Sequence, residues 1–251
     1  LDPQRDRIRS VLTEEELPAA AVMSIQPDPE EERLWLGVWG TGLVRYDIPA
    51  EFRDGEEPAG GPALELFPLG DDRVYTVLPG PDRYVFAGSW GGGLYRVDRV
   101  TGEVDGFRHE PSQLYSLSHD TVYSLAFDDS GALWIGTNGG GVNRLSENKR
   151  NYLRFRHEYQ SPAGVSQGRI TAIRRDSYGS LWIGTYNGGL NRYDAERDEM
   201  IHYRADPSRP AALSNDIITA IYEDSQRNLW IATNEGLNRY LRERYSFETF
   251  H

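Results

Sequence analysis

The tripeptide Leu-Trp-Ile recurs at a constant interval of 48 residues. Its three copies contain Trp134, Trp182 and Trp230. Two further apolar registers keep this interval, one beginning at Val122 and the other at Phe107. Two more divergent copies precede these three, LWLGVWGTGLVRYD at residues 34–47 and YVFAGSWGGGLYRVD at residues 84–98. A fixed period of about 20–50 residues is the signature of a repeat architecture. The chain therefore has to fold as five similar units in sequence.

Each copy contains four short apolar segments separated by residues that form turns. In the fourth copy the segments read RITAIRR, SLWIGT, GLNRYD and MIHYRA, and the first two are joined by DSYGS. Asp, Ser and Gly in such a connection predict a tight turn between antiparallel strands. Four strands in a unit of this length are typical of a β-propeller blade. We expect an all-β propeller of four-stranded antiparallel blades, with five blades at residues 21–69, 73–110, 121–158, 169–205 and 217–251.

Two smaller features of the repeat bear on how the blades pack. The LWI segments are apolar on both faces, which is expected when a neighbouring blade covers each side of the sheet. One position of the second strand is always small, and small residues there would allow close packing of adjoining blades. The residues at this position are Gly37, Gly88, Gly136, Gly184 and Ala232.

Residues 1–20 resemble the end of one copy and the link to the next. Residues 7–11 are predicted to form a lone fourth, outer strand, followed by a linker. Either the chain is a section of a larger propeller, or this strand pairs elsewhere and helps to close a ring. We favour the first explanation, because six to eight blades are more usual than five, within a range of about four to eight.

Composition excludes several classes of function. The formal net charge is -12, which disfavours a nucleic-acid partner because phosphate contacts require a basic face. There is no cysteine, hence no disulfide framework and no zinc–thiolate site. No apolar run approaches the roughly 20 residues that span a bilayer, so we expect membrane attachment only through segments outside this chain. The first residues do not read as a signal peptide, which is either absent or already removed.

The turn between the second and third strands is the most informative variable stretch. It reads VWGTG, SWGGG, TNGGG, TYNGG and TNEG in the five copies. In a propeller these turns share one face with the loops that lead into each blade. Aromatic and amide side chains around such a mouth would suit sugar stacking and hydrogen bonding. The candidate ligand-binding residues are Trp39, Trp90, Asn138, Tyr186, Asn187 and Asn234 on the turns and His119, Arg169 and Asn215 on the incoming loops.

Other interpretations of these residues remain open at this point. The aromatic rings could pack against neighbouring loops while the polar groups cap turns. Glycine-rich turns also occur in phosphate sites, but those are followed by a helix and usually carry a lysine, and the only lysine here is Lys149. The acidic runs lack the alternating spacing of a calcium loop. We therefore expect no cofactor, no metal site and no catalytic residue, and an enzyme would need His119 to converge with Asp120 or Asp216.

The third to fifth copies resemble the two-component regulator propeller repeat. The residues that carry this resemblance are ITAIRRDSYGSLWIGTYNGGLNRYD and ITAIYEDSQRNLWIATNEGLNRY. The resemblance implies a periplasmic or extracellular sensor domain that precedes a membrane span and a histidine kinase or diguanylate cyclase. Some members of this family sense oligosaccharides, so it also implies a small-molecule or oligosaccharide ligand, and signalling receptors of this type often act as homodimers. A propeller enzyme, such as a lyase or glycosidase, and a protein-interaction platform are the alternatives.

Overall fold

The computed structural model describes most of the chain as β-strands joined by short turns. The described residues are 17, 21–49, 63–113, 115–145, 152–155, 164–194, 196–197 and 199–250. The lone strand predicted at residues 7–11 lies outside them. The chain divides into two compact units, Leu1–Gly106 and Phe107–His251, and each is described separately.

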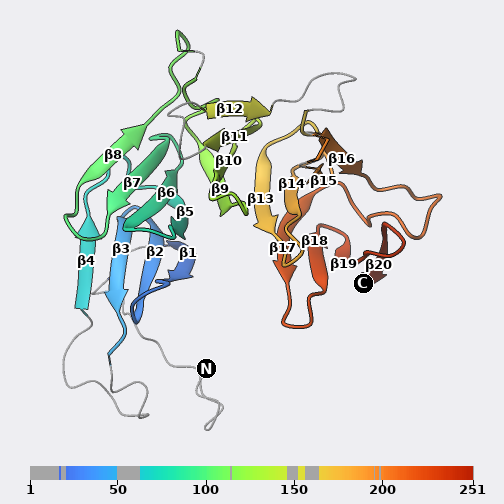
Figure 1. The fold of residues 1–251 in the computed structure, drawn as a ribbon, viewed down its shortest axis with the longest axis horizontal. Coiled ribbons are helices and arrows are strands. Elements are labelled where there is room, and N and C mark those ends of the chain that lie inside the picture. Colours follow the sequence, from blue (N-terminus) through green and yellow to red (C-terminus); the bar gives the residue numbers. More distant parts are fainter. Residues whose placement is uncertain are drawn as a thin grey trace. The chain divides into compact units, whose positions relative to one another are not determined.

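The first unit contains two sheets of four strands (Figure 1). Blade 1 consists of β1 (Ala21–Pro27), β2 (Arg33–Trp39), β3 (Gly42–Asp47) and β4 (Ala63–Phe67). Blade 2 consists of β5 (Val74–Pro79), β6 (Tyr84–Ser89), β7 (Leu94–Asp98) and β8 (Val104–Phe107), whose last residue is counted with the second unit. In both sheets each strand is hydrogen-bonded to the next strand in the sequence.

The second unit contains three further sheets with the same strand order. Blade 3 consists of β9 (Val122–Phe127), β10 (Leu133–Thr137), β11 (Val142–Leu145) and β12 (Tyr152–Phe155). Blade 4 consists of β13 (Ile170–Arg175), β14 (Leu181–Thr185), β15 (Leu190–Asp194) and β16 (Glu199–Tyr203). Blade 5 consists of β17 (Ile218–Glu223), β18 (Leu229–Thr233), β19 (Gly236–Leu241) and β20 (Ser246–Phe250).

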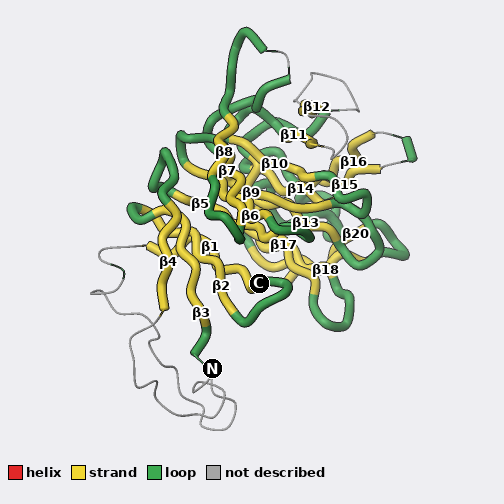
Figure 2. Tube along the Cα trace, turned by 60° about the vertical axis from the view of Figure 1, so that its left-hand side comes forward, coloured by secondary structure: helices red, strands yellow, loops and turns green. Residues whose placement is uncertain are grey.

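The prediction of five four-stranded antiparallel blades is confirmed. Consecutive strands pair antiparallel in blade 1 and in all three blades of the second unit. None of the residues that the structure describes is helical, as the colouring of Figure 2 shows. Accordingly, no helix long and apolar enough to cross a membrane occurs in this part of the chain.

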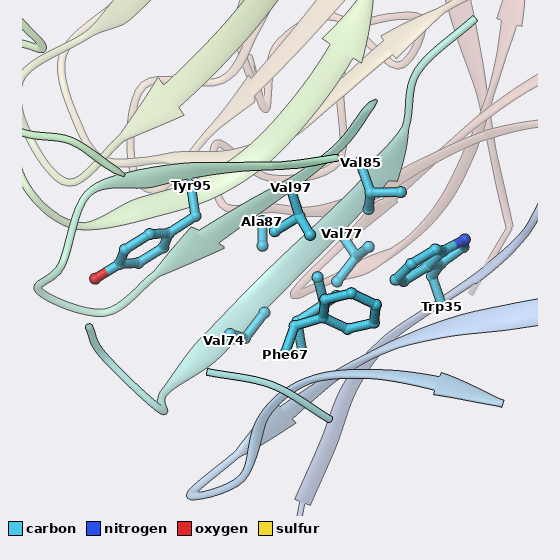
Figure 3. Packing of buried hydrophobic residues seen from close by; sticks show 9 residues of the cluster. Trp35, Phe67, Val74, Val77, Val85, Ala87, Tyr95 and Val97 are labelled. Atoms are coloured by element: carbon cyan, nitrogen blue, oxygen red, sulfur yellow. The ribbon is translucent and has the colours of Figure 1, made fainter. Parts of the chain in front are cut away.

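The tryptophan of the second strand is inserted between its own sheet and the next. Trp35 of blade 1 has no exposed surface and packs with Phe67 of its own blade and with Val77 and Val85 of blade 2 (Figure 3). Trp134 and Trp182 are equally buried, against residues of blades 4 and 5 respectively. A buried ring of this size removes roughly 150–250 Å² from water, which contributes about 4–6 kcal/mol at about 25 cal/mol per Å².

The small residue of the second strand allows this close approach. A Cβ atom at Gly136 would lie 2.5 Å from Cγ2 of Ile170, the first residue of blade 4. A Cβ atom at Gly184 would lie 2.6 Å from Cγ2 of Ile218, the first residue of blade 5. The predicted role of the small position in blade packing is confirmed at these two junctions, where a β-branched side chain of the next blade fills the space above the glycine.

Each buried tryptophan also needs a partner for its indole N–H, and an aspartate provides it. Trp134 and Trp182 donate from Nε1 to Oδ2 of Asp128 and Asp176, each at 2.7 Å. The other carboxylate oxygen of Asp176 accepts backbone N–H bonds from Tyr178 and Ser180, at 3.0 and 2.9 Å. One carboxylate therefore closes the turn between the first two strands and satisfies the ring that follows it.

Blade 2 lacks both members of this pair. Phe86 stands at the tryptophan position and Gly80 at the aspartate position, six residues before it; blades 3 to 5 have aspartate at this spacing, and blade 1 has Asp28 seven residues before Trp35. A phenylalanine ring has no N–H to satisfy and Gly80 has no carboxylate, so both partners of this hydrogen bond are missing together. Replacing both partners of a buried hydrogen bond by apolar groups costs little, whereas removing one of them leaves an unsatisfied group.

We expect Gly184→Ala to destabilise the second unit by about 1–3 kcal/mol, because the added methyl group would overlap Ile218. The measurement is the free energy of unfolding from denaturant titration followed by circular dichroism. Ala232→Gly at the matched position of blade 5 is the control, with an expected loss of at most about 1 kcal/mol. Equal effects of the two substitutions would show that the small position does not set the blade spacing.

The lowered pKa of Asp224 in blade 5 leads us to expect that the protein loses stability in acid. The hydrogen bond from the Trp230 indole, with further bonds from Asn228 and Gln226, lowers the pKa of this carboxyl to about 2. Because the unfolded-state pKa is about 3.9, the stabilisation is complete above about pH 4 and is lost as the pH falls towards about 2. Asp224→Asn should therefore flatten the fall of the melting temperature across this window. Glu235→Gln, which removes another carboxylate of blade 5, should leave the fall unchanged.

Candidate functional site

The nine predicted ligand-binding residues lie at one end of their blades. Strand pairing places the turn between the second and third strands at the same end of a blade as the segment that leads into its first strand. Backbone bonds join the two: the N–H of Trp90 donates to the carbonyl of Arg73 at 3.0 Å, and that of Tyr186 to Arg169 at 2.9 Å. The same bond links Asn138 with Thr121 and Asn234 with Ile217. We call this end of each blade its loop end.

An aromatic cluster stands at the loop end of the first unit. The rings of Trp39 and Trp90 meet edge to face, with centroids 5.5 Å apart, and the ring of Tyr75 lies 6.2 Å from that of Trp90. Trp90 is 37% exposed although it is one of the largest apolar side chains of the protein. We call Trp39, Tyr75 and Trp90 the aromatic platform. The structure thus brings two predicted residues together and adds Tyr75, which the sequence analysis missed.

An ion pair lies in the segment that leads into the platform. Arg73 donates from Nε to Oδ1 of Asp71 at 2.9 Å and from Nη2 to Oδ2 at 3.0 Å. Burial opposes ionisation of Asp71, but the bonds from Arg73 outweigh it and hold the pKa of this carboxyl below its ordinary value. The Asp71 carboxylate also accepts the backbone N–H of Arg73 at 3.0 Å. Arg73 is therefore neutralised within its own loop.

A cation held by two aromatic rings stands at the loop end of blade 4. The guanidinium carbon of Arg169 lies 4.4 Å from the ring centre of Tyr186 and 5.5 Å from that of Tyr123. Tyr186 is 39% exposed, whereas Tyr123 is buried. The neighbouring Asn187 is exposed and adopts a left-handed backbone conformation, with φ of 75°. Arg169 and Tyr186 are thus brought together, and Tyr123 is a second residue that the sequence analysis missed.

Two of the predicted residues cap turns. Nδ1 of His119 accepts the backbone N–H of Thr121 at 2.9 Å, and Oδ1 of Asn215 accepts that of Ile217 at 2.7 Å. For both residues the capping interpretation is the one that the geometry supports. A ring nitrogen that accepts this bond carries no proton, so the proton of a neutral His119 ring is on Nε2. That tautomer presents a donor to a ligand and has no free lone pair for a general base.

Asp120 and Asp216, the carboxylates that an acid–base mechanism would need beside His119, also accept hydrogen bonds from backbone N–H groups. Oδ1 of Asp120 accepts the N–H of His109 at 2.6 Å, and Oδ1 of Asp216 accepts that of Ala205 at 2.7 Å. His119 does not contact either carboxylate through any described hydrogen bond or ion pair. Among the residues that the structure describes, no group of three or more acidic or histidine side chains is arranged to hold a metal ion.

The remaining two predicted residues are Asn138 and Asn234, which bond to described residues through their backbone N–H groups. Asn138 is half-buried and Asn234 is exposed, and the backbone N–H of each donates to the segment that leads into its blade. Their side chains are therefore available at the loop end.

A groove of about 1020 Å³ is lined mainly by β19, β20 and the turn between them in blade 5, with Tyr178 from the end of blade 4 opposite its loop end. None of the nine predicted residues lines it. Its wall includes Tyr178 and several arginines. The guanidinium carbon of Arg242 lies 4.0 Å from the centre of the Tyr178 ring, while its Nη1 donates to Asp176 at 2.9 Å. This groove was not predicted from the sequence, because it is formed by side chains of the outer strands and turns that come together only in the folded blade.

The third to fifth blades share a buried asparagine on the third strand. Asn191 of the third strand is fully buried, and its Oδ1 accepts the backbone N–H of Ser166 at 2.9 Å, 25 residues earlier. The same bond joins Asn143 with Ser118 and Asn238 with Ser214. This bond connects the incoming segment to the third strand of the blade that follows. Blades 1 and 2 have Val44 and Tyr95 at the position of the asparagine, and neither side chain has an amide.

A family description, the two component regulator propeller, matches residues 116–139, 164–187 and 212–235. Each matched segment begins two residues before the serine that donates to the buried asparagine, and it ends in the turn at the loop end. Blades 3 to 5 thus each contain, with the segment that leads into them, a stretch that matches the two-component regulator propeller repeat. Among curated proteins, none matches the chain.

Solved propeller structures resemble the chain over most of its length. The extracellular domain assigned to the hybrid two component system BT4673 from B. thetaiotaomicron aligns with a TM-score of 0.67 and 22% identity, over 91% of this chain and 27% of that one. That of BT3049 from the same organism aligns with a TM-score of 0.59 and 21% identity, over 96% and 35%. Virginiamycin B lyase from Staphylococcus aureus aligns with a TM-score of 0.65 and 14% identity, over 91% and 69%.

These likenesses establish the propeller fold that the repeats predict. The chain spans about a quarter to a third of the length of the two B. thetaiotaomicron domains. A fold shared with extracellular domains of two component systems and with a lyase does not by itself decide what the chain does.

The capping role of His119 can be tested by substitution. His119→Ala should cost about 0.5–1.5 kcal/mol of unfolding free energy, because the N–H of Thr121 loses its acceptor. His119→Asn should restore most of this stability, since asparagine caps the same turn at position 215. Denaturant titration of the two variants checks both values. An unchanged stability of His119→Ala would show that the bond has no structural role.

Proposed function

We propose that this chain is a ligand-sensing propeller module of a transmembrane signalling receptor, located in the periplasm or outside the cell. The two-component regulator propeller repeats support this proposal, as does the likeness in fold to extracellular domains of hybrid two component systems. The ligand is a small polar molecule, in the first place an oligosaccharide, which binds at the loop ends. The membrane span and the output domain belong to segments outside this chain.

The observation that carries the proposal is the aromatic platform. A sugar ring presents a face of C–H groups that stacks on an exposed aromatic ring, while its hydroxyl groups bond to neighbouring polar side chains. Trp90 offers such a ring, which Trp39 meets edge to face and beside which the Tyr75 ring lies at an angle of 37°. The matched turns of blades 3 and 5 carry Asn138 and Asn234 instead of tryptophan. The two rings are therefore not required to build a blade.

The mechanism that follows is non-catalytic. A ligand that contacts turns of several blades, or turns of two copies of the chain in a homodimer, favours the arrangement in which all contacts are made at once. The shift in population is limited by the difference in the ligand's affinity for the two arrangements. The described residues offer the acid–base alternative no assembled pair, since His119, Asp120 and Asp216 are each held in backbone bonds.

Calorimetric titration of the protein with a panel of oligosaccharides tests the proposal. We expect at least one to bind, and Trp90→Ala to weaken that binding about tenfold or more, equivalent to about 1.4 kcal/mol. Tyr178→Ala is the matched control, because it removes an exposed ring from the groove at the opposite end of a blade. Circular dichroism confirms that both variants fold.

Two results would contradict the proposal. No heat with any oligosaccharide would argue against a carbohydrate sensor. Binding that is lost in Tyr178→Ala and kept in Trp90→Ala would move the site to the groove.

A further inference from the structure

Two blades carry an arginine in the same register of the segment that leads into the first strand. Arg73 directly precedes β5, and Arg169 directly precedes β13, two repeat periods later. In both blades the arginine carbonyl accepts the N–H of an aromatic residue from the turn between the second and third strands, Trp90 in one and Tyr186 in the other. The repeat thus places the same cation at the loop end twice, and the two copies can be compared directly.

The two arginines differ in their partners. Arg73 makes two hydrogen bonds to the carboxylate of Asp71. The residue in the register of Asp71 in blade 4 is Gln167, which has no charge. Within the part of the chain that the structure describes, Arg169 has no ion pair and no side-chain hydrogen bond. Its guanidinium group lies over the tyrosine rings of Tyr123 and Tyr186.

The loop of blade 4 holds Arg169 without neutralising it. The rings of Tyr123 and Tyr186 flank the guanidinium group, and such rings attract a cation through their π-electrons while its N–H donors stay free. The preceding Gly168 has φ of 123°, and a Cβ atom there would lie 2.2 Å from the Tyr186 carbonyl oxygen. The close contact between the two loop segments therefore requires glycine at this position, and it brings Tyr186 beside Arg169.

We propose that Arg169 binds a carboxylate of the ligand, which takes the place that Asp71 has beside Arg73 in blade 2. The inference rests on the proposed function and specifies it: the ligand is an oligosaccharide that contains a uronic acid. The guanidinium group presents paired N–H donors in a planar fork that fits a carboxylate with two parallel bonds. Asn187, exposed on the same turn, is placed to contact the hydroxyl groups of the same sugar.

The test compares one uronic-acid oligosaccharide with its methyl ester, which keeps the sugar and removes the charge. Wild-type protein should bind the acid at least tenfold more tightly than the ester in calorimetric titration. Gln167→Asp should remove this preference, because the new carboxylate can pair with Arg169 as Asp71 pairs with Arg73. Binding of the ester should persist in this variant. Arg169→Gln should likewise remove the preference, and it supports the same conclusion should Gln167→Asp fail to fold.

Arg174→Gln is the matched control. Arg174 is also exposed and lies 5.9 Å from the centre of a single ring, that of Tyr222, but it stands at the far end of β13 from Arg169. The preference for the acid should be unchanged in this variant. In the wild-type protein the preference for the acid over the ester should fall as the salt concentration rises, since the pair between Arg169 and the ligand is exposed to solvent.

The outcomes separate this inference from the proposed function. Equal binding of acid and ester by the wild-type protein, or a preference that survives both Gln167→Asp and Arg169→Gln, would overturn the role of Arg169 and leave the sensor proposal standing. A sulfated oligosaccharide that binds while the uronic acid does not would overturn the carboxylate assignment. No binding of any oligosaccharide would overturn both proposals.

Discussion

The insertion of one tryptophan between consecutive sheets is the interaction on which the rest of the structure depends. A sheet that is apolar on both faces has to be covered on both faces, and the following blade provides the cover. The buried ring in turn needs an acceptor for its N–H, and the aspartate that accepts it also closes the preceding turn. Packing, turn geometry and polar satisfaction are therefore coupled in a single pair of residues. Blade 2 is consistent with this coupling, because it has Phe86 in place of the tryptophan and also Gly80 in place of the aspartate.

This division of roles leaves the loop ends free to vary. In blades 1, 3 and 4 the glycine and the tryptophan of the second strand pack inside the blade, and the aspartate lies at the end opposite the loop end. The turn between the second and third strands has to supply little beyond a tight reversal. Its first variable position can therefore be tryptophan in blades 1 and 2, tyrosine in blade 4 and asparagine in blades 3 and 5. Differences between copies at such a position carry information about ligands that the shared residues do not.

The repeat made the fold readable from the sequence, because periodic tryptophans and glycines report on packing that every blade shares. The candidate site was readable only in part. Strand order placed all nine residues at the loop ends, but contacts between side chains of different loops depend on rotamers that no period records. Tyr75 and Tyr123 were therefore missed, although they occupy the same register one period apart. The capping bonds of His119 and Asn215 were considered as an alternative and could be assigned only from atomic positions.

A repeat protein supplies its own comparison between a structural residue and a functional one. Asp71, His119 and Asn215 differ in chemistry, yet each accepts the backbone N–H two residues later, so what these positions share is a structural role. Gln167 stands in the same register and makes no such bond to a described residue. Among the described residues, the incoming segment of blade 4 therefore differs in three respects together: Gln167 caps no backbone N–H, Gly168 has positive φ, and Arg169 has no ion pair. A segment maintained only for blade closure would not need this combination, whereas one that presents a cation to a ligand would.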